Sequence, residues 1–201
     1  MFHVKHEGWE LARSLGVELD DTAIVRLERF EGLVRERALP MGMVGPSDAG
    51  RLRERHLMDS LRAAPHLPER GTVCDLGSGA GFPGLVLAIA RPDLRFVLVE
   101  VRRNRARFLE QASADLDNVH IHGRRLETFR DRVDMCTARA FASASKSWGA
   151  ATAILRVGGS LVYWGGTTFD GAVDVPPGVS GELFLTPALA RSGPLVIMAQ
   201  Q

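Results

Sequence analysis

A glycine-rich turn is the part of the sequence whose residue types and spacing carry the clearest chemistry. In TVCDLGSGAGFPG, residues 72–84, a short apolar run leads into three alternating glycines and then into a helix that begins near Pro83. Glycines let the main chain turn sharply and let a ligand approach it closely. The pattern alone is weak evidence, but at the first strand-to-helix turn of a βα unit it predicts a nucleotide-type ligand. The loop residues expected at this site are Gly77, Ser78, Gly79 and Gly81.

The acid beside this turn indicates which nucleotide binds. Asp75 stands just before Gly77, and the spacing is Gly-x-Gly-x-Gly rather than Gly-x-Gly-x-x-Gly. A dinucleotide places its pyrophosphate at the helix N-terminus, where a carboxylate would repel it. S-adenosylmethionine has no phosphate and carries a sulfonium and an ammonium, which a carboxylate attracts. Asp75 therefore favours the methyl donor over NAD.

Two further acids follow the next two strands. Glu100 ends the second strand at about the 20-residue offset where an acid meets the ribose hydroxyls in such folds. After the third strand, Leu126 and Glu127 supply an apolar side chain and an acceptor for an adenine. Each acid could instead be a solvated strand end or helix face. Taken together and in strand order, the three acids favour one adenosine ligand.

The surrounding pattern predicts the fold that positions these residues. From residue 72 onward, short apolar runs alternate with amphipathic stretches, which is typical of strands and helices around a parallel sheet. We expect an α/β, Rossmann-like core over residues 69–201 with about seven strands, the last two antiparallel, and a loop at 166–181. The expected strands are TVCDL, RFVLVE, NVHIH, RVDMCTA, SLVYW, ELFLTP and PLVIMA.

Residues 1–68 are expected to form a helical extension packed on this core, so that the 201-residue chain makes one compact domain. Apolar residues at three- and four-residue intervals predict two helices within 7–37, the second capped by Asp20 or Asp21. A turn-rich stretch at 40–50 precedes a third helix in RLRERHLMDSLRAA.

Composition limits the class of protein. Hydrophobic residues make up 45% and charged residues 24% of the chain, which excludes a disordered protein. No apolar run reaches the ~18 residues of a membrane span and no signal peptide is evident, so we expect a cytoplasmic protein without a membrane partner. Cys74 and Cys136 lie in apolar runs and are expected to be buried, unpaired and without a metal.

Several motifs, in their order along the chain, resemble one family, the bacterial small-subunit (16S) ribosomal RNA guanine-N7 methyltransferases, also called glucose-inhibited division protein B. DLGSGAGFPG followed by RAFAS is the specific part of the match, because the glycines alone are shared by a broad class. Two positions depart from the family: PMGMV lacks a common Asn-Leu-Thr, and Trp164 stands where a lysine before glycine is common. The similar blocks are ERHLMDSL, DLGSGAGFPG, ARPDLRFVLVE, RFLEQ, RRLETF and ARAFAS.

The resemblance implies a class I S-adenosylmethionine-dependent methyltransferase that releases S-adenosylhomocysteine. It implies methylation of guanine N7 in 16S ribosomal RNA, at guanosine 527 of the decoding-region loop, in the small subunit or a precursor. We expect a monomer. By the same resemblance, Arg125 and Arg139 become candidates for the substrate side. The residues that the resemblance places at the methyl donor are Gly77, Phe82, Leu126, Glu127 and Arg139.

Transfer to guanine N7 requires little acid–base chemistry, because the N7 lone pair has no proton to lose. Catalysis then depends on alignment of the two reactants, and Arg139 can donate to guanine O6 without blocking N7. His56 and Asp59 are three residues apart in the expected third helix, so they could meet on one face at the cofactor mouth and are further candidates for positioning the guanine. The alternative for this pair is a helix-stabilising contact.

Arginine clusters near the expected strand ends predict contact with RNA phosphates, although the net charge of the chain is only +1. Solvated helix faces are the alternative for these clusters. Alternatives for the whole protein are a methyltransferase of another RNA or a small molecule, a non-catalytic RNA-binding relic of this fold, and a nicotinamide-dependent oxidoreductase. The clusters are Arg51, Arg53 and Arg55; Arg102, Arg103, Arg105 and Arg107; and Arg124, Arg125, Arg130 and Arg132.

Overall fold

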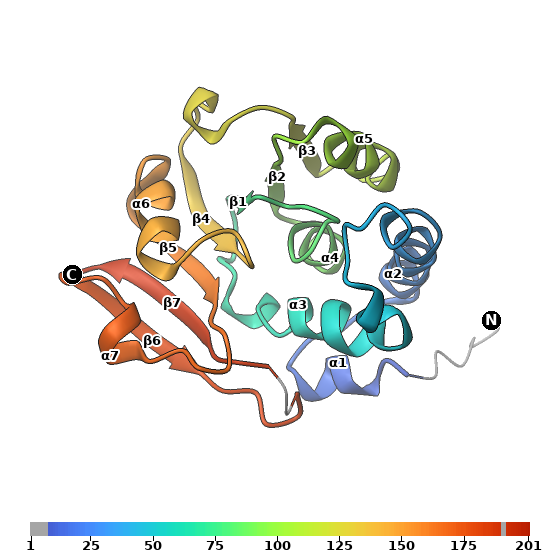
Figure 1. Ribbon diagram of the computed structural model, residues 1–201, viewed down its shortest axis with the longest axis horizontal. Coiled ribbons are helices and arrows are strands. Elements are labelled where there is room, and N and C mark those ends of the chain that lie inside the picture. The colour runs from blue at the N-terminus through green and yellow to red at the C-terminus, as the bar shows by residue number, and fades with distance from the viewer. Residues whose placement is uncertain (1–7, 190–191) are drawn as a thin grey trace.

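A seven-stranded mixed sheet forms the centre of the computed structural model, which describes residues 8–189 and 192–201 (Figure 1). Neighbouring strands follow the order β3-β2-β1-β4-β5-β7-β6. Strand β7 runs antiparallel to β5 and β6, and the other neighbours are parallel, as the sequence predicts. The strands are β1 (Thr72–Leu76), β2 (Arg95–Val99), β3 (Val119–His122), β4 (Val133–Ala138), β5 (Leu155–Trp164), β6 (Val179–Phe184) and β7 (Leu195–Gln200).

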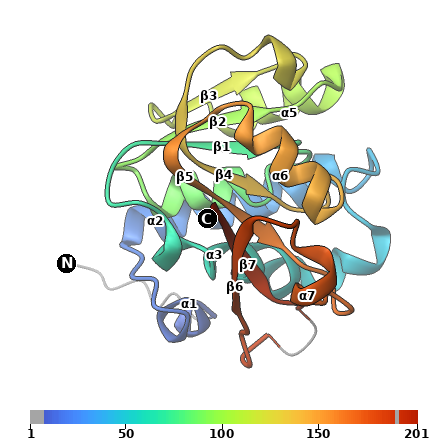
Figure 2. The ribbon, with the colours of Figure 1, turned by 90° about the vertical axis from the view of Figure 1, so that its left-hand side faces the viewer.

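Helices cover both faces of this sheet. Helices α4 and α5 lie on one face together with the N-terminal helices, and α6 lies on the other (Figures 1 and 2). Because both faces are covered, β1 and β2 read as nearly continuous apolar runs and most of their side chains are buried. These helices are α4 (Gly84–Ala90), α5 (Arg103–Ala112) and α6 (Ala144–Thr152).

The N-terminal segment packs outside α4. Leu27 and Phe30 are buried in the same hydrophobic cluster as Leu85 of α4. Asp20 caps α2, its Oδ1 accepting from the Ala23 N–H at 2.7 Å, which confirms one of the two predicted caps. The segment contains α1 (Glu10–Ser14), α2 (Asp21–Leu33), η1 (Val34–Ala38), η2 (Pro46–Arg51), η3 (Arg53–Met58), α3 (Asp59–Leu61) and η4 (Ala64–His66). A boundary between 68 and 69 stays a prediction, and residues 1–7 lie outside the described part.

The third helix and the tail differ from expectation. Residues 53–58 form a π-helical segment instead of regular α-helix, a form that occurs often at functional sites. Residues 166–181 are not all loop: they include α7 (Gly171–Asp174), capped by Asp170, and the start of β6. Pattern reading missed α7 because a single turn of helix has too little periodicity to detect.

The prediction that both cysteines are buried and unpaired is confirmed. Cys74 and Cys136 are buried and free, and they pair in register across β1 and β4. Burial raises the pKa of the Cys136 thiol well above its ordinary value, so it stays protonated.

Among the described helices, none is both long and apolar enough to cross a bilayer. No cluster of three or more potential metal ligands occurs within the described residues.

Candidate cofactor and substrate site

A cavity of about 650 Å³ opens at the carboxyl ends of β1, β4 and β5. The chain reverses its direction of strand addition between β1 and β4, and in open α/β sheets ligands bind outside the strand ends at this point. The N-terminal segment closes one side of the cavity. The cavity is lined by Met43, Val44, Asp48, Arg55, His56, Asp59, Arg62, Gly77, Ser78, Gly79, Ala80, Phe82, Arg105, Arg139, Ala140, Tyr163, Trp164, Gly165, Gly166, Thr167, Ser192 and Gly193.

The glycine loop after β1 forms the wall of the cavity next to the sheet, and Gly77, Ser78, Gly79 and Phe82 all line the cavity. Gly77 has a φ of +69°, and a Cβ there would lie 2.7 Å from Cδ2 of Phe141. A side chain at this position would therefore be strained and would also collide with the loop after β4. The fourth predicted loop residue, Gly81, has a φ of +94° and packs against Leu85 below the cavity surface.

Asp75 does not face the cavity, so the interpretation that it attracts a cationic ligand directly is wrong in its geometry. Its carboxylate is 1% exposed and accepts from the Thr137 hydroxyl at 2.7 Å and the Gly84 N–H at 3.2 Å. Burial raises its pKa to about 6, against the opposing effect of these hydrogen bonds. Asp75 ties β1 to β4 and to the start of α4, and so holds the glycine loop from beneath.

Glu100 lies at the end of β2, directly beside the loop. Its carboxylate accepts from the Gly79 N–H at 3.1 Å and from the Arg102 N–H at 2.7 Å, and Arg105 Nη1 lies 4.0 Å away. The sequence thus identified an acid that contacts the loop. Its contact with a ribose stays a prediction.

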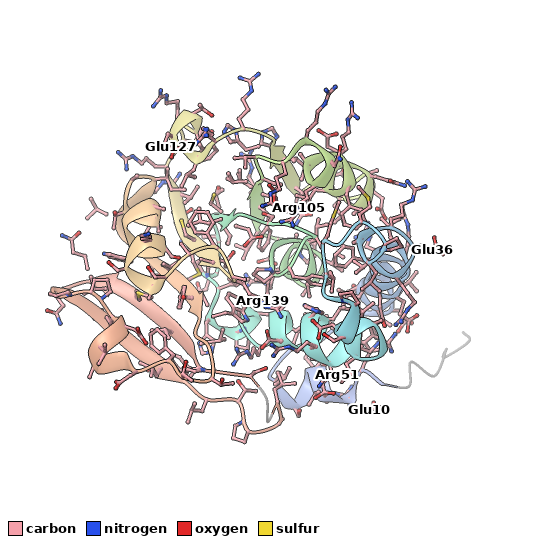
Figure 3. The ribbon with its side chains drawn as sticks, viewed as in Figure 1. Glu10, Glu36, Arg51, Arg105, Glu127 and Arg139 are labelled. Carbon is pink, nitrogen blue, oxygen red and sulfur yellow. The ribbon has the colours of Figure 1, made fainter. Side chains whose placement is uncertain are left out.

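The two residues expected to contact the adenine do not line the cavity. Leu126 and Glu127 begin the short 3₁₀ turn η5 (Leu126–Thr128), with Leu126 half-buried and Glu127 exposed. Arg125, which precedes them, is exposed as well, and Figure 3 shows Glu127 at the margin, far from the centrally placed Arg139. Of the four candidates for positioning guanine, Arg139, His56 and Asp59 line the cavity and Arg125 does not.

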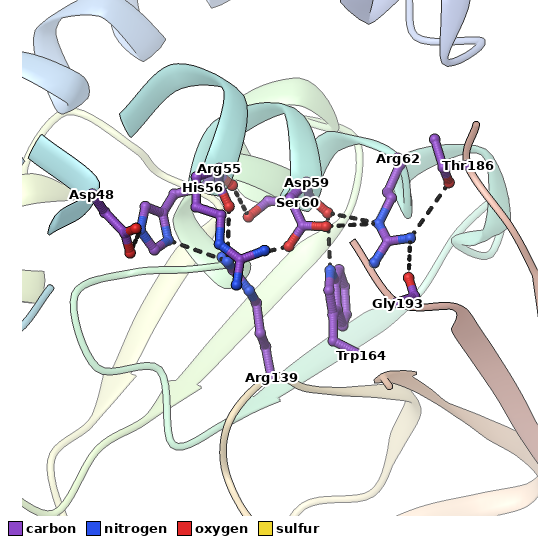
Figure 4. A network of polar contacts seen from close by, with 10 residues as sticks. All are labelled: Asp48, Arg55, His56, Asp59, Ser60, Arg62, Arg139, Trp164, Thr186 and Gly193. Carbon is purple, nitrogen blue, oxygen red and sulfur yellow. Dashed lines mark hydrogen bonds and ion pairs between the residues drawn. The ribbon is translucent and has the colours of Figure 1, made fainter. Parts of the chain in front are cut away.

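Arg139 follows β4 and lies at the centre of a polar network (Figure 4). Its Nη2 is 3.2 Å from Oδ2 of Asp59 and donates to the Arg55 carbonyl at 2.9 Å. Its Nη1 is buried and has no hydrogen-bond partner among the described residues. A buried donor without a partner is costly, so this nitrogen is the strongest indication of where a ligand acceptor belongs.

His56 and Asp59 do not meet, because Arg139 lies between them. The Nε2 atom of His56 lies 3.0 Å from Oδ2 of Asp48, and its Nδ1 lies 3.2 Å from Nη2 of Arg139. The His56 ring also stacks on Phe82. In the π-helical segment the backbone bonds span five residues, so a three-residue spacing no longer aligns two side chains. Burial, together with the charge of Arg139, lowers the pKa of His56 to about 4, so the ring is neutral near pH 7.

The sequence indicated no contact role for Asp48 or Arg62, and Trp164 stood out only as a departure from the family. Asp48 lies in the short 3₁₀ helix η2, and Arg62 is 3% exposed, with Nε 3.0 Å from Oδ1 of Asp59. Trp164 is 6% exposed and its Nε1 donates to the Asp59 carbonyl at 2.9 Å. Trp164 therefore braces Asp59, and it is not placed on the surface as a lysine that grips RNA would be. Pairwise contacts between such distant segments leave no local pattern.

The arginine clusters prove to be of several kinds. Arg53 forms an ion pair with Glu31 at 2.8 Å, and its guanidinium lies over the Trp9 ring. Arg132 precedes β4, so it lies at the amino edge of the sheet, where it donates to the Ala153 and Leu155 carbonyls. The expectation that all three clusters lie at or lead to the cavity edge is therefore wrong for Arg132. Arg55 and Arg105 line the cavity itself.

The site suits an adenosine-type methyl donor by its chemistry. A volume of about 650 Å³ is in the range of ligand pockets, Gly77, Ser78 and Gly79 of the glycine loop line it, and Arg139 Nη1 has no acceptor among the described residues. A parallel sheet of this order, with an antiparallel seventh strand and a glycine loop after β1, defines a class I S-adenosylmethionine-dependent methyltransferase. Residues 24–171 match the family model described as rRNA small subunit methyltransferase G. The chain belongs to this family.

Curated relatives agree over most of the chain. A ribosomal RNA small subunit methyltransferase G from Mycobacterium leprae (strain Br4923) is 37% identical, covering 96% of this chain and 94% of that protein. The protein of the same name from Clavibacter sepedonicus is 35% identical, covering 85% of this chain and 82% of its own length. The identity with that from Caulobacter vibrioides (strain NA1000 / CB15N) is 42%, over 69% of this chain and 66% of the relative.

Solved structures share the fold. A putative S-adenosyl-L-methionine-dependent methyltransferase from Methanococcus maripaludis superposes with a TM-score of 0.57 at 14% identity, covering 83% of this chain and 93% of that chain. A ribosomal protein L11 methylase from Lactobacillus delbrueckii subsp. bulgaricus gives a TM-score of 0.56 at 12% identity, covering 73% and 79%. These similarities confirm the predicted fold class.

Proposed function

We propose that this chain transfers a methyl group from S-adenosylmethionine to N7 of a guanine in 16S ribosomal RNA, the guanosine 527 position that the family resemblance implies. Family membership supports the ribosomal RNA substrate. One structural observation carries the site assignment: the buried, unpartnered Nη1 of Arg139, which lines the same cavity as the glycine loop.

When bound, S-adenosylmethionine supplies an electrophilic sulfonium methyl. The residues of the chain then hold and align the reactants, which can contribute ~7–11 kcal/mol to a displacement of this kind. The glycine loop, held by Asp75 below and by Glu100 beside it, presents main-chain groups to the donor. No side chain has to remove a proton, because guanine N7 has none.

Arg139 orients the guanine in this proposal. Its Nη1 donates to guanine O6, while Asp59 and the Arg55 carbonyl fix Nη2. His56, neutral near pH 7, accepts from Arg139 at Nδ1 and donates to Asp48 from Nε2, so it is a positioning residue for the guanidinium. The predicted role of Arg139 at the methyl donor is the alternative for the same nitrogen.

Arg139→Lys separates these two roles, since lysine keeps the charge and loses the planar fork. Under the proposal, KM for RNA rises and kcat falls, while the Kd for the methyl donor measured by calorimetry stays within about threefold. A loss confined to donor binding would assign Arg139 to the cofactor instead.

The function itself is tested with small ribosomal subunits from cells that lack the modification. Labelled methyl should be transferred to these subunits or to their 16S ribosomal RNA, and primer extension should place it at one guanosine. Subunits that already carry the methyl group are the matched control. Transfer to free metabolites alone would overturn the proposal, and a chain that fails to bind the donor in calorimetry would be a relic. We also propose a monomer acting in the cytoplasm, where its ribosomal substrate is assembled.

A further inference from the structure

A second cavity lies next to the first one, at the start of α5. It measures about 390 Å³ and is lined by residues 41–43 and 102–105, the N-terminal segment on one side and the start of α5 on the other. The two cavities share Met43 and Arg105 in their walls, so they are direct neighbours. A hydrogen bond of 2.8 Å from Arg37 to Gln111 ties the two walls together.

The charges around this cavity are of one sign. Its lining contains three arginines and no acid. Within the described residues, the exposed side chains of Arg102 and Arg103 make no ion pair or hydrogen bond. Arg105 has a partner, Glu100, but only at 4.0 Å. Guanidinium groups that are exposed and unpaired are available for phosphate, which they bind in a planar, bidentate manner.

These arginines are placed where they disfavour the helix that carries them. Arg102 is the N-cap of α5 and Arg103 begins it, and the first turn contains no acid. The positive end of the helix dipole favours carboxylates at this point and disfavours cations. A cationic first turn beside an open cavity therefore has no role in stabilising α5 and fits an anionic partner.

The opposite wall is apolar. Met41 is 51% exposed and Met43 half-buried, and both line the cavity across from the arginines. A thioether packs favourably against aromatic rings, so one wall can hold a base while the other holds the phosphate attached to it. Figure 3 shows Arg105 beside α5 in the central part of the molecule, where Arg139 also lies.

From this geometry we infer an RNA subsite that deepens the proposed function: the cavity between residues 41–43 and 102–105 binds the nucleotide adjoining the target guanosine. Arg102 and Arg103 contact phosphodiester oxygens and Met41 packs on the base. The inference rests on the proposed RNA substrate, and its chemistry is that of a single-stranded phosphodiester.

The test compares two double variants by RNA binding across a salt series. Arg102→Gln with Arg103→Gln removes the two free guanidinium groups of the subsite. Arg70→Gln with Arg95→Gln is the matched control, because these arginines are also exposed and carry no side-chain partner among the described residues, but lie before and at the start of strands, at the opposite edge of the sheet. The probe is an unmodified 16S ribosomal RNA fragment that contains the target loop, with S-adenosylhomocysteine present.

The subsite variant should lower the slope of log Kd against log salt by about 1.4, at ~0.7 per single-strand phosphate, and the control should leave it unchanged. Its kcat/KM on unmodified subunits should fall at least about tenfold, mainly through KM, whereas donor binding stays at the wild-type value. Its melting temperature should be equal to or above that of wild type, since two cations leave a helix N-terminus. Met41→Ala should weaken binding by roughly fivefold without altering the slope.

Equal salt slopes for wild type and the subsite variant, with wild-type transfer intact, would overturn the subsite and leave the proposed function standing. Absence of transfer by the wild-type chain itself would overturn the function. A loss of slope of the same size in the control variant would show that charge alone, and not this cavity, determines RNA binding.

Discussion

The floor of the first cavity, formed by Asp59, Arg62 and Arg139, and the rim at the start of α5, which carries Arg102 and Arg103, both depend on arginine. The two regions use the arginine charge in opposite ways. On the floor, Arg139 and Arg62 are nearly buried and both are within 3.2 Å of Asp59. On the rim, Arg102 and Arg103 are exposed without a partner among the described residues. A buried charge needs a fixed partner, whereas an exposed one is hydrated and stays free for a mobile polyanion. The floor therefore fixes geometry and the rim attracts the substrate.

The largest effect should come from Asp59→Ala, which leaves two buried guanidinium groups without their shared carboxylate. We expect the free energy of unfolding to fall by ~3–5 kcal/mol and methyl transfer to be lost. Urea denaturation measures the stability. If Asp59→Ala does not fold, Asp59→Asn should still show the activity loss in a folded protein.

A surface pair serves as the comparison for this variant. Arg29 Nη1 lies 2.9 Å from Asp115 Oδ2, with both side chains substantially exposed. Arg29→Gln should change stability by less than about 1 kcal/mol. A similar loss in both variants would break the contrast between buried and exposed arginines.

Two buried groups, Asp75 and His56, should change the stability of the fold in opposite directions as pH rises. The pKa of Asp75 rises from 3.8 to about 6 in the fold, so its contribution to stability is lost as pH rises through this window. The pKa of His56 falls from 6.5 to about 4, so its burial becomes less costly as pH rises over nearly the same window. In wild type the two effects, each ~3 kcal/mol, oppose one another.

Single variants separate these effects. Between pH 4 and pH 6, Asp75→Asn should gain up to ~3 kcal/mol of stability relative to wild type, because the cost of ionising Asp75 is removed. His56→Asn should lose a similar amount over pH 4 to 6.5. Urea midpoints at half-unit pH steps measure both, and parallel curves for all three proteins would contradict the burial of these groups.

Gly77→Ala should have an intermediate effect at the border between the two regions. A φ of +69° costs an alanine ~1–2 kcal/mol, and its Cβ would collide with Phe141. We expect weaker donor binding in calorimetry and a lower melting temperature. Adding Phe141→Ala should restore part of the loss, because it removes the collision and keeps the backbone strain; full restoration would show that φ is not constrained.

Among the variants of the cavity lining, the smallest effect on stability should come from Trp164→Phe, which removes the hydrogen bond to the Asp59 carbonyl and keeps most of the packing. The expected loss of stability is ~1 kcal/mol. The salt slope of RNA binding should stay unchanged, because Trp164 is buried. A changed slope would place Trp164 in contact with RNA and blur the division between floor and rim.

The sequence by itself determined the order of the strands along the chain, the glycine loop and the position of Glu100 beside it. These features are local: a run of apolar residues followed by glycines has few alternatives, and the offset between Gly77 and Glu100 follows from one βα unit. The β1 run TVCDL matches the observed strand Thr72–Leu76 residue by residue. The bounds were less certain elsewhere: the sixth strand was expected at 182–187 and lies at Val179–Phe184. Family-like motifs in their order then indicated the methyl donor and the ribosomal RNA.

Only the tertiary structure decided what the charged residues do. Asp75 was read as facing the ligand and is buried beneath the loop, while His56 and Asp59 were paired by spacing and are separated by Arg139. Sequence spacing shows which residues are near along one helix or strand. It does not show that a side chain from a distant segment, such as Arg139, lies between two such residues, because that depends on how the elements pack.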